Sequence, residues 1–281
     1  MDILNLSWFL GRILDFFLPR TCVVCEAVLF DDEKLLCGKC SGDIPHTYFW
    51  IMRKNPMADK FNALIQEDLI AALDALTPEK EGVIHEKSAT SPVRDYSLLG
   101  RGERYAYAAA LFFYRSESEY RKITQVIKYH GREDVGRAFG QMLGERLRGS
   151  SLYADVDAIV PVPLHWTRHW KRGYNQAEII AGGVAEAMGI PVRSDILRRC
   201  RRTKTQTRLD IDEKTRNVKD AFAGRSHLSS DDTGTTFHHL LLIDDVYTTG
   251  STLHACFLAL RTAFPPPIRI SIATLGFVGG T

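Results

Sequence analysis

From Tyr105 onward, short apolar runs alternate with segments in which apolar residues recur at helical spacing. The runs predict strands over 105–114, 156–160, 190–192, 239–243 and 268–275, and the periodic segments predict helices over 118–129, 135–147, 176–188 and 252–263. Strands that alternate with helices form right-handed βαβ units and a mainly parallel sheet. The pattern therefore predicts an α/β domain, in which ligands bind at loops leaving the carboxyl ends of the strands.

The first part of the chain lacks this alternation. Apolar residues at helical spacing predict an amphipathic helix over 2–18, which Pro19 ends, and a second helix over 58–76. The apolar face of the first helix is expected to pack on the chain's own module or core, with membrane association or a partner groove as alternatives. We divide the chain into 1–44, an amino-terminal helix and cysteine module; 45–104, a variable helical or linker insertion; and 105–281, the α/β domain.

Composition adds limits on function. The chain has 281 residues, 45% of them hydrophobic and 25% charged, which are ordinary globular values. Its formal charge is only +2, from 36 Lys plus Arg and 34 Asp plus Glu, so any polyanion must be bound locally and not by bulk charge. Asp2, Arg12 and Asp15 interrupt the first apolar run, which therefore fits neither a signal peptide nor a membrane span. A cytoplasmic location is expected.

Four of the six cysteines lie in one short segment, as two C-x-x-C pairs. In a reducing compartment, paired knuckles of this kind are typical of a tetrahedral Zn²⁺ site, and four thiolates make such a site structural. Redox chemistry at one pair is the alternative. The predicted ligands are Cys22, Cys25, Cys37 and Cys40, while Cys200 and Cys256 are isolated.

The segment 240–252, LLLIDDVYTTGST, joins a buried strand, two carboxylates, a loop of small and hydroxyl residues, and a helix. Backbone N–H groups and hydroxyls at a helix N-terminus suit a phosphate dianion. Asp244 and Asp245 would repel a phosphate, and we interpret them as acceptors for two vicinal sugar hydroxyls. The alternative is a plain helix cap beside solvated carboxylates. The predicted phosphate contacts are Thr248, Thr249, Gly250, Ser251 and Thr252.

Two basic segments complete the candidate chemistry. The first, within VPVPLHWTRHWKRGYNQAE over 160–178, interleaves cations with aromatic side chains, a pattern that can also stack single-stranded bases. Its candidate nucleic-acid or acceptor contacts are Trp166, Arg168, Trp170, Lys171, Arg172 and Tyr174. The second segment runs over 198–208 and contains six cations. Solvated surface is the alternative for both segments.

Several motifs together resemble known families. The segment 240–252 resembles the phosphoribosyl pyrophosphate (PRPP) loop of type I phosphoribosyltransferases. In order, PVPLH, RGYNQ, KTQTRL, RNV and IDDVYTTGST resemble the ComF family of phosphoribosyltransferase-like proteins, as do LPRTC at 18–22 and IKYHG at 127–131. The resemblance covers 18–42 and roughly 105–275. Residues 45–104 do not match and lack the second cysteine cluster of many relatives.

The resemblance implies a type I phosphoribosyltransferase fold, a mainly parallel sheet flanked by helices, with a small zinc-ribbon-like module. It implies an enzyme that binds Mg²⁺-PRPP and transfers the phosphoribosyl group to an unknown acceptor, with residues 45–104 as a hood. Lys204, supported by Arg202 and Arg208, would close over the leaving pyrophosphate, and the predicted catalytic residues are Lys204, Arg202 and Asp245. The pyrophosphate contacts would be Pro161, Val162, Pro163, Leu164 and His165.

A second hypothesis belongs to another class of function. The ComF family is associated with DNA uptake in natural transformation, so the chain could be a non-catalytic factor that binds single-stranded DNA. The cysteine module and the basic aromatic stretch would then contact the DNA, and other DNA-uptake proteins would be partners. A homodimer is left open.

Overall fold

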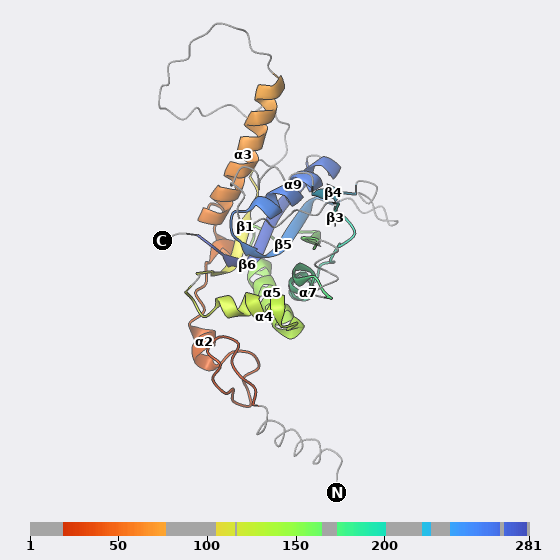
Figure 1. Ribbon diagram of the computed structural model, residues 1–281. Helices are drawn as coiled ribbons and strands as arrows, with labels where there is room; N and C mark the ends of the chain where they lie inside the picture. Colours follow the sequence, from red (N-terminus) through yellow and green to blue (C-terminus); the bar gives the residue numbers. More distant parts are fainter. Residues whose placement is uncertain are drawn as a thin grey trace, which may run out of the picture.

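A computed structural model describes residues 19–76, 105–115, 117–164, 173–200, 221–225, 237–264 and 267–279. The helix predicted over 2–18 lies outside the described residues. In Figure 1 the cysteine module, which contains helix α2 (Gly38–Gly42), lies at one end of the molecule beside α4, and the sheet lies between two groups of helices. None of the described helices is both long and apolar enough to cross a membrane.

The core is a four-stranded sheet in the order β1-β6-β5-β2, in which all neighbours are parallel. The strands are β1 (Ala108–Phe113), β2 (Ala158–Pro161), β5 (His239–Tyr247) and β6 (Arg269–Phe277). The predicted α/β architecture with a mainly parallel sheet is confirmed. Each of the four strands differs from the predicted one by one to four residues at one or both ends. The largest difference is at β5, which continues to Tyr247 because β6 goes on pairing with it as far as Phe277, so the two aspartates belong to the strand.

Two short features differ from the pattern-based prediction. The strand expected over 190–192 is reduced to one isolated bridge between Ile159 and Val192. Pro191 has no N–H group to donate, which limits the ladder there. A second, antiparallel pair, β3 (Leu197–Arg199) with β4 (Phe222–Gly224), was not predicted, because three residues per strand carry no usable period.

Alternation along β5 divides the core into two layers. Leu240 and Leu242 face a cluster that includes residues of α3 (Pro56–Leu76) and α9 (Ser251–Ala263). Leu241 and Ile243 face the opposite cluster. That second cluster includes residues of α4 (Arg121–Tyr129), α5 (Glu133–Arg148) and α7 (Gln176–Met188). Side chains of successive strand residues point to opposite faces, so each helix layer packs on one set. Figure 1 shows both helix layers around the sheet.

The predicted helices that fall within the described residues are confirmed, with small differences at their ends. The bounds of α7 are those predicted, while α4 begins at Arg121, three residues after the expected start. Residues 118–120 form a turn instead, in which Ser118 Oγ accepts a hydrogen bond from the N–H of Tyr120. A serine hydroxyl that bonds nearby backbone competes with helix in this way.

Strand β1 is an edge strand of the sheet, and residues 44–62 cover its free side. Near the short 3-10 helix η1 (Phe49–Ile51), His46 forms an antiparallel bridge with Phe112. The amide of Asn55 donates to the carbonyl of Ala108 at 2.9 Å, and Asn62 donates to the carbonyl of Ala106 at 2.9 Å. An uncovered edge strand would leave a row of unpaired backbone groups. These contacts tie the segment after the cysteine module firmly to the α/β core.

The amino ends of β5 and β6 are joined by a chain of polar side chains that runs from the exposed Asp155 to the buried His239 and Ser271. His239 Nδ1 lies 2.8 Å from Asp155 Oδ1, and His239 Nε2 lies 2.8 Å from Ser271 Oγ. Arg269 donates to the other carboxylate oxygen of Asp155 at 2.9 Å. The order Ser–His–Asp is that of a hydrolytic triad, but both Ser271 and His239 are 0% exposed. No substrate can reach this serine, so the chain of bonds is a structural cross-link.

Candidate functional site

The candidate site lies at the carboxyl ends of β5 and β2, where the sequence pattern placed it. Asp244 and Asp245 are consecutive on β5 and lie in different surroundings. The Asp245 carboxylate is 2.7 Å from the ammonium nitrogen of Lys128, in the last turn of α4, and the two side chains are 9% and 27% exposed. Burial alone would lower the pKa of Lys128, but the charge of Asp245, the hydrogen bond to it and the charge of Asp244 together raise that pKa. This is a largely buried ion pair.

Asp244 lies beside the predicted phosphate loop, residues 248–252, instead. Its Oδ1 accepts a hydrogen bond from the N–H of Asp245 at 2.8 Å. Burial and the neighbouring charge of Asp245 raise the pKa of Asp244 to about 7. It lines a small hollow of about 40 Å³ together with residues 246–253, whereas Asp245 is not part of that lining. Asp244 is therefore the carboxyl group of the pair that lines the hollow.

The loop from Thr248 to Gly250 leads into the N-terminus of α9. Gly250 is the N-cap residue and has φ of 80°, and a Cβ there would lie 2.5 Å from the hydroxyl of Tyr247. Glycine tolerates this left-handed conformation and also leaves room for the tyrosine ring. The hydroxyls of Thr249 and Ser251 are 2.9 Å apart. The loop thus places exposed hydroxyls and a helix N-terminus around the hollow, an arrangement that suits an oxyanion.

The loop after β2 is held beside β5 by α7. Asn175 caps α7 by accepting from the N–H of Ala177 at 3.2 Å, and its amide donates to the carbonyl of Val162 at 3.1 Å. The N–H of Val162 in turn donates to the carbonyl of Ile243 at 2.9 Å. Pro161 is the last residue of β2, and Pro163 and Leu164 follow half-buried. The predicted pyrophosphate loop and the phosphate loop therefore lie on neighbouring strands.

Tyr174 has a structural contact of its own. Its hydroxyl donates to the carbonyl of Ile127 at 2.5 Å, one residue before Lys128. The ring is half-buried. From the sequence we predict that Tyr174 contacts nucleic acid or the acceptor, and that role stays a prediction. In the structure, the tyrosine links the start of α7 to the end of α4, which carries the lysine of the ion pair.

Several predicted site residues lie outside the described part of the chain. They are His165, Trp166, Arg168, Trp170, Lys171 and Arg172 of the first basic segment, and Arg202, Lys204 and Arg208 of the second. Their roles stay predictions. The described end of the second segment reaches the site, because the positive charge of Arg199 on β3 acts to lower the pKa of Asp244. The Arg199 guanidinium also lies 5.0 Å from the ring centre of Phe222.

Sequence reasoning missed the roles of Lys128 and Arg199. Lys128 belongs to the segment IKYHG, which was noticed as a motif without a chemical role. Nothing in the spacing of the sequence relates residue 128 to residue 245. The sequence showed only that Lys128 lies in the last turn of a predicted helix. Surface helices often have a lysine there, so this position did not indicate a contact with Asp245.

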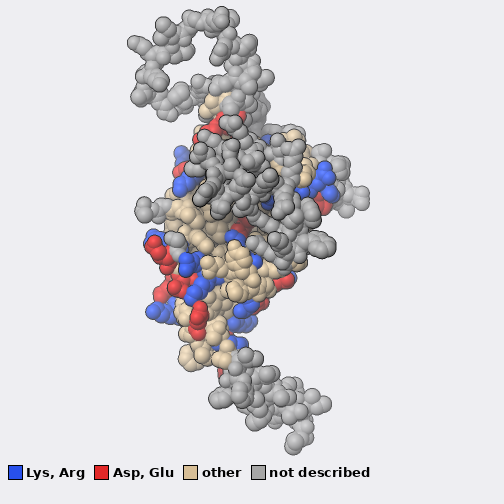
Figure 2. All heavy atoms as spheres, in the orientation of Figure 1, with Lys and Arg blue, Asp and Glu red and all other residues tan. Residues whose placement is uncertain are grey.

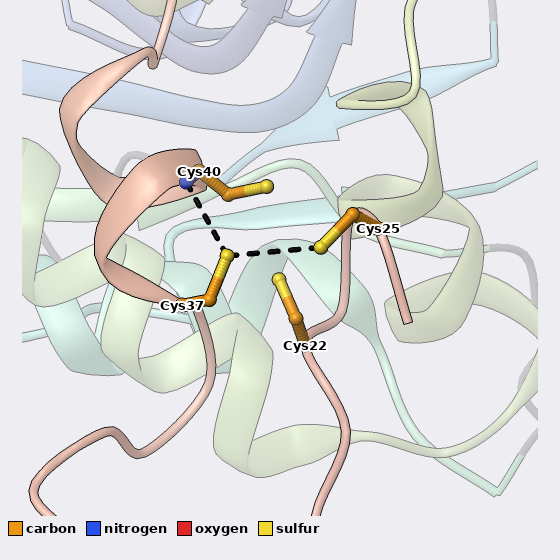
Figure 3. Close-up of side chains that lie close together, drawn as sticks. All are labelled: Cys22, Cys25, Cys37 and Cys40. Carbon is orange, nitrogen blue, oxygen red and sulfur yellow. Dashed lines mark hydrogen bonds between the residues drawn. The ribbon is translucent and has the colours of Figure 1, made fainter. Parts of the chain in front are cut away.

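The four cysteines of the module do come together. Their sulfur atoms all lie within 4.8 Å of one another, and the Cys25 and Cys37 sulfurs are 3.7 Å apart (Figure 3). A tetrahedral ion with Zn–S bonds of about 2.3 Å requires sulfur–sulfur distances of about 3.8 Å. Burial raises the pKa of the Cys22 thiol, but backbone N–H donors outweigh it and lower that pKa to about 7. The cluster fits a metal ion such as zinc.

Local backbone geometry forms the first cysteine pair, and α4 holds the module. The N–H of Cys22 donates to the carbonyl of Ala27, and Glu26 adopts φ of 63° to close the turn. From the start of α4, the Tyr120 hydroxyl donates to the carbonyl of Cys40 at 2.8 Å, and the ammonium of Lys122 donates to the carbonyl of Val24 at 3.1 Å. The same helix therefore contacts the cysteine module at its first turn and the acidic pair at its last.

Fold and site together define an α/β protein with a parallel sheet, an acidic pair that precedes an oxyanion-type loop, and a four-thiol module. No family model matches the chain. It is 37% identical over 105 residues to competence protein F of Haemophilus influenzae, covering 37% of this chain and 44% of that protein. It is 34% identical over 130 residues to the DNA utilization protein YhgH of Salmonella typhi, covering 45% and 54%. The YhgH protein of Escherichia coli K12 is 32% identical over 133 residues.

Over the matched residues the chain is therefore similar to competence and DNA utilization proteins, which agrees with the resemblance of its motifs to the ComF family. The chain spans about half the length of the curated relatives it matches. Among solved structures, glutamine PRPP amidotransferase from B. subtilis aligns with 49% of this chain and 26% of its own, at 21% identity and a TM-score of 0.32.

Proposed function

We propose that this protein binds Mg²⁺-PRPP at the carboxyl end of β5, on a phosphoribosyltransferase-type fold, and transfers its phosphoribosyl group to an acceptor. The observation that carries the proposal is the position of Asp244, which lines one small hollow together with the Thr248–Thr252 loop. A carboxylate beside an oxyanion site is unfavourable for phosphate alone. It suits a ligand that presents a phosphate and, a few ångströms away, hydroxyl donors, as a ribose 5-phosphate does.

Each part of the ligand has a matching part in the site. The 5′-phosphate would accept hydrogen bonds from backbone N–H groups and hydroxyls of residues 248–252. The ribose hydroxyls would donate to Asp244 and to the carboxylate oxygen of Asp245 that Lys128 does not contact. The pyrophosphate would lie on residues 161–165, on the neighbouring strand. Mg²⁺ would enter as the counter-ion of the pyrophosphate.

The transfer step makes one bond and breaks one. A nitrogen lone pair of the acceptor, a nucleobase or an amine, attacks C1 of the ribose, and the C1–O bond breaks with its electron pair leaving on pyrophosphate. The proton released by the acceptor nitrogen passes to pyrophosphate or to water. Negative charge grows on the leaving oxygens, where Lys204 and Arg202 are proposed to close and stabilise it.

Isothermal titration calorimetry with Mg²⁺-PRPP tests the binding site. Wild type should bind, and Asp244→Asn and Asp245→Ala should each weaken binding by at least about tenfold, the loss expected when a charge-assisted hydrogen bond is removed. Asp32→Asn, at an exposed position of the cysteine module, is the matched control and should bind as wild type does. Equal affinity in all four proteins would refute the assignment of the site. Release of pyrophosphate with a panel of nucleobases and amines then tests transfer.

A second candidate function follows from the relatives, which are named for competence and DNA utilization. We propose that single-stranded DNA binds along the basic aromatic stretch at 166–174 and the cysteine module. On the face drawn in Figure 2, basic and acidic side chains of the described residues are interspersed. DNA binding would therefore depend on a local group of basic residues and not on the charge of the whole face. Titration of single-stranded DNA at rising salt should show a steep loss of affinity. Absence of binding at low salt would exclude this function.

A further inference from the structure

We propose that Lys128 is a positioning residue for the acidic pair: its ammonium holds one carboxylate oxygen of Asp245 toward α4, while Asp244 lines the hollow that receives the ligand. The inference rests on the proposed function, because it specifies how one site receives a ribose. It assigns different tasks to two residues that the sequence presents as equivalent.

The asymmetry is geometric. Lys128 Nζ lies 2.7 Å from Asp245 Oδ2, whereas Asp244 lines the hollow of the phosphate loop. Strand alternation produces this separation, since adjacent residues of β5 direct their side chains to different faces. The α4 face of the sheet receives Asp245, and the end of α4 supplies the cation. The side chain of Tyr174 bonds the carbonyl of Ile127 and so anchors the backbone that carries Lys128.

Two adjacent carboxylates with little exposure cannot both stay ionised without a counter-charge. Lys128 supplies that charge on the Asp245 side, and the charge of Arg199 acts on Asp244. Burial and the charge of Asp245 nevertheless leave the pKa of Asp244 raised to about 7. The titratable or charged groups recorded around the pair are Lys128, Arg199, Tyr114 and the buried thiol of Cys256.

The chemical consequence concerns how hydroxyl groups are recognised. With Lys128 in place, Asp245 is a fixed acceptor whose second oxygen has a constant orientation. Asp244 then alternates near neutral pH between a carboxylate, which accepts from a ribose hydroxyl, and a carboxylic acid, which accepts more weakly. Without Lys128, Asp244 would lose a positive charge that lowers its pKa, and it would be a weaker hydrogen-bond acceptor at pH 7.

Titration of Mg²⁺-PRPP affinity between pH 6 and 9 tests this in wild type, Lys128→Met, Lys128→Gln and Lys128→Arg. Wild-type affinity should rise with pH and level off above the pKa of Asp244. The two neutral variants should need a higher pH for the same rise, by about one unit or more, since the pair loses its counter-charge. Lys128→Arg keeps the charge and should retain the wild-type midpoint. The titration of PRPP itself is common to all four proteins and cancels in the comparison.

The carboxyl ¹³C resonances of labelled aspartate, assigned with Asp244→Asn and Asp245→Asn, are followed through the same titrations without ligand. An upward displacement of the carboxyl midpoints in both neutral variants supports the role of Lys128, and unchanged midpoints overturn it. If wild type binds no PRPP, the proposed function fails, and the resonances still decide the role of the lysine. If PRPP binds with the same pH midpoint in all four proteins, the proposed function stands and the inference about Lys128 is wrong.

Discussion

The cysteine module and the carboxyl edge of the sheet are two sites of opposite construction that share one helix. The module takes all four sulfurs from residues 22–40, a single short segment. The edge gathers its parts from α4, β2, α7, β5 and the start of α9, which are far apart in the chain. Helix α4 contacts the module through Tyr120 and Lys122 and the acidic pair through Lys128.

The difference teaches what kind of sequence signal each site leaves. When all ligands of a metal site come from one short segment, their spacing can be recognised directly in the sequence. A site built across a sheet leaves separate fragments, each of which has an ordinary alternative reading. Residues 240–252 form the one continuous fragment of this edge that suggests a type of binding loop by itself, and that interpretation stays a prediction.

The largest expected effect is removal of the metal from the module. Structural zinc contributes about 10 kcal/mol or more to the folding of small four-ligand modules. We expect one zinc per chain by elemental analysis, and Cys37→Ser should lose it and release residues 20–42 from α4. Hydrogen exchange reports that release as lost protection of the Cys22 and Val23 amides. Cys200→Ser, at an exposed cysteine outside the cluster, is the control and should keep its zinc. A fully protected, zinc-free Cys37→Ser module would contradict the structural role of the metal.

Loss of the buried cation at the edge should be the next largest effect. Lys128→Met leaves the carboxylate of Asp245 without its partner, and removal of one member of a buried pair costs about 3 kcal/mol. Denaturant unfolding should show this, and the double variant Lys128→Met, Asp245→Asn should recover part of the loss because no charge is left unpaired. Lys54→Met, at an exposed position, should change the free energy of unfolding little. A double variant no more stable than Lys128→Met would show that the pair is not coupled.

A smaller loss is expected at the phosphate loop. Gly250→Ala places a side chain in a left-handed conformation and against the hydroxyl of Tyr247, which should cost about 1–2 kcal/mol. Gly182→Ala is the matched control, since its Cβ meets nothing within 4 Å, and it should be neutral or slightly stabilising. Thermal unfolding and PRPP titration of both variants measure the effect. Equal stability of the two would mean that the loop relaxes without cost.

The smallest effect is a pH dependence at the opposite end of β5. Burial holds the pKa of His239 below its ordinary value of about 6.5. A depressed folded-state pKa means that this contribution to stability is complete above about pH 6.5 and declines as the pH falls below it, because the unfolded chain takes up the proton first. Denaturant midpoints of wild type should therefore decline between pH 7 and pH 5. His239→Gln should flatten that decline, and an equal slope in both proteins would assign it to other groups.

Much of the fold could be read from pattern alone, and the exceptions have local causes. Helix α7 has the predicted bounds because Asn175 caps one end and Gly189 adopts a left-handed conformation at the other. The strand expected over 190–192 shrank because Pro191 cannot donate to a ladder. Strand β5 extends beyond its apolar run because β6 continues to pair with it as far as Tyr247. This pairing depends on a distant segment and cannot be predicted from the residues near 244–247 alone.

The sequence by itself determined the parallel α/β architecture, the four-cysteine cluster and the glycine-containing loop that leads from β5 into α9, because period, spacing and glycine placement are local properties of the chain. Only the tertiary structure decided that the acidic pair is divided, with Asp244 at the hollow and Asp245 bound to Lys128. The reason is that an electrostatic partner is chosen by distance in space. Residues 128 and 245 become neighbours only after α4 has packed on the sheet beside β5.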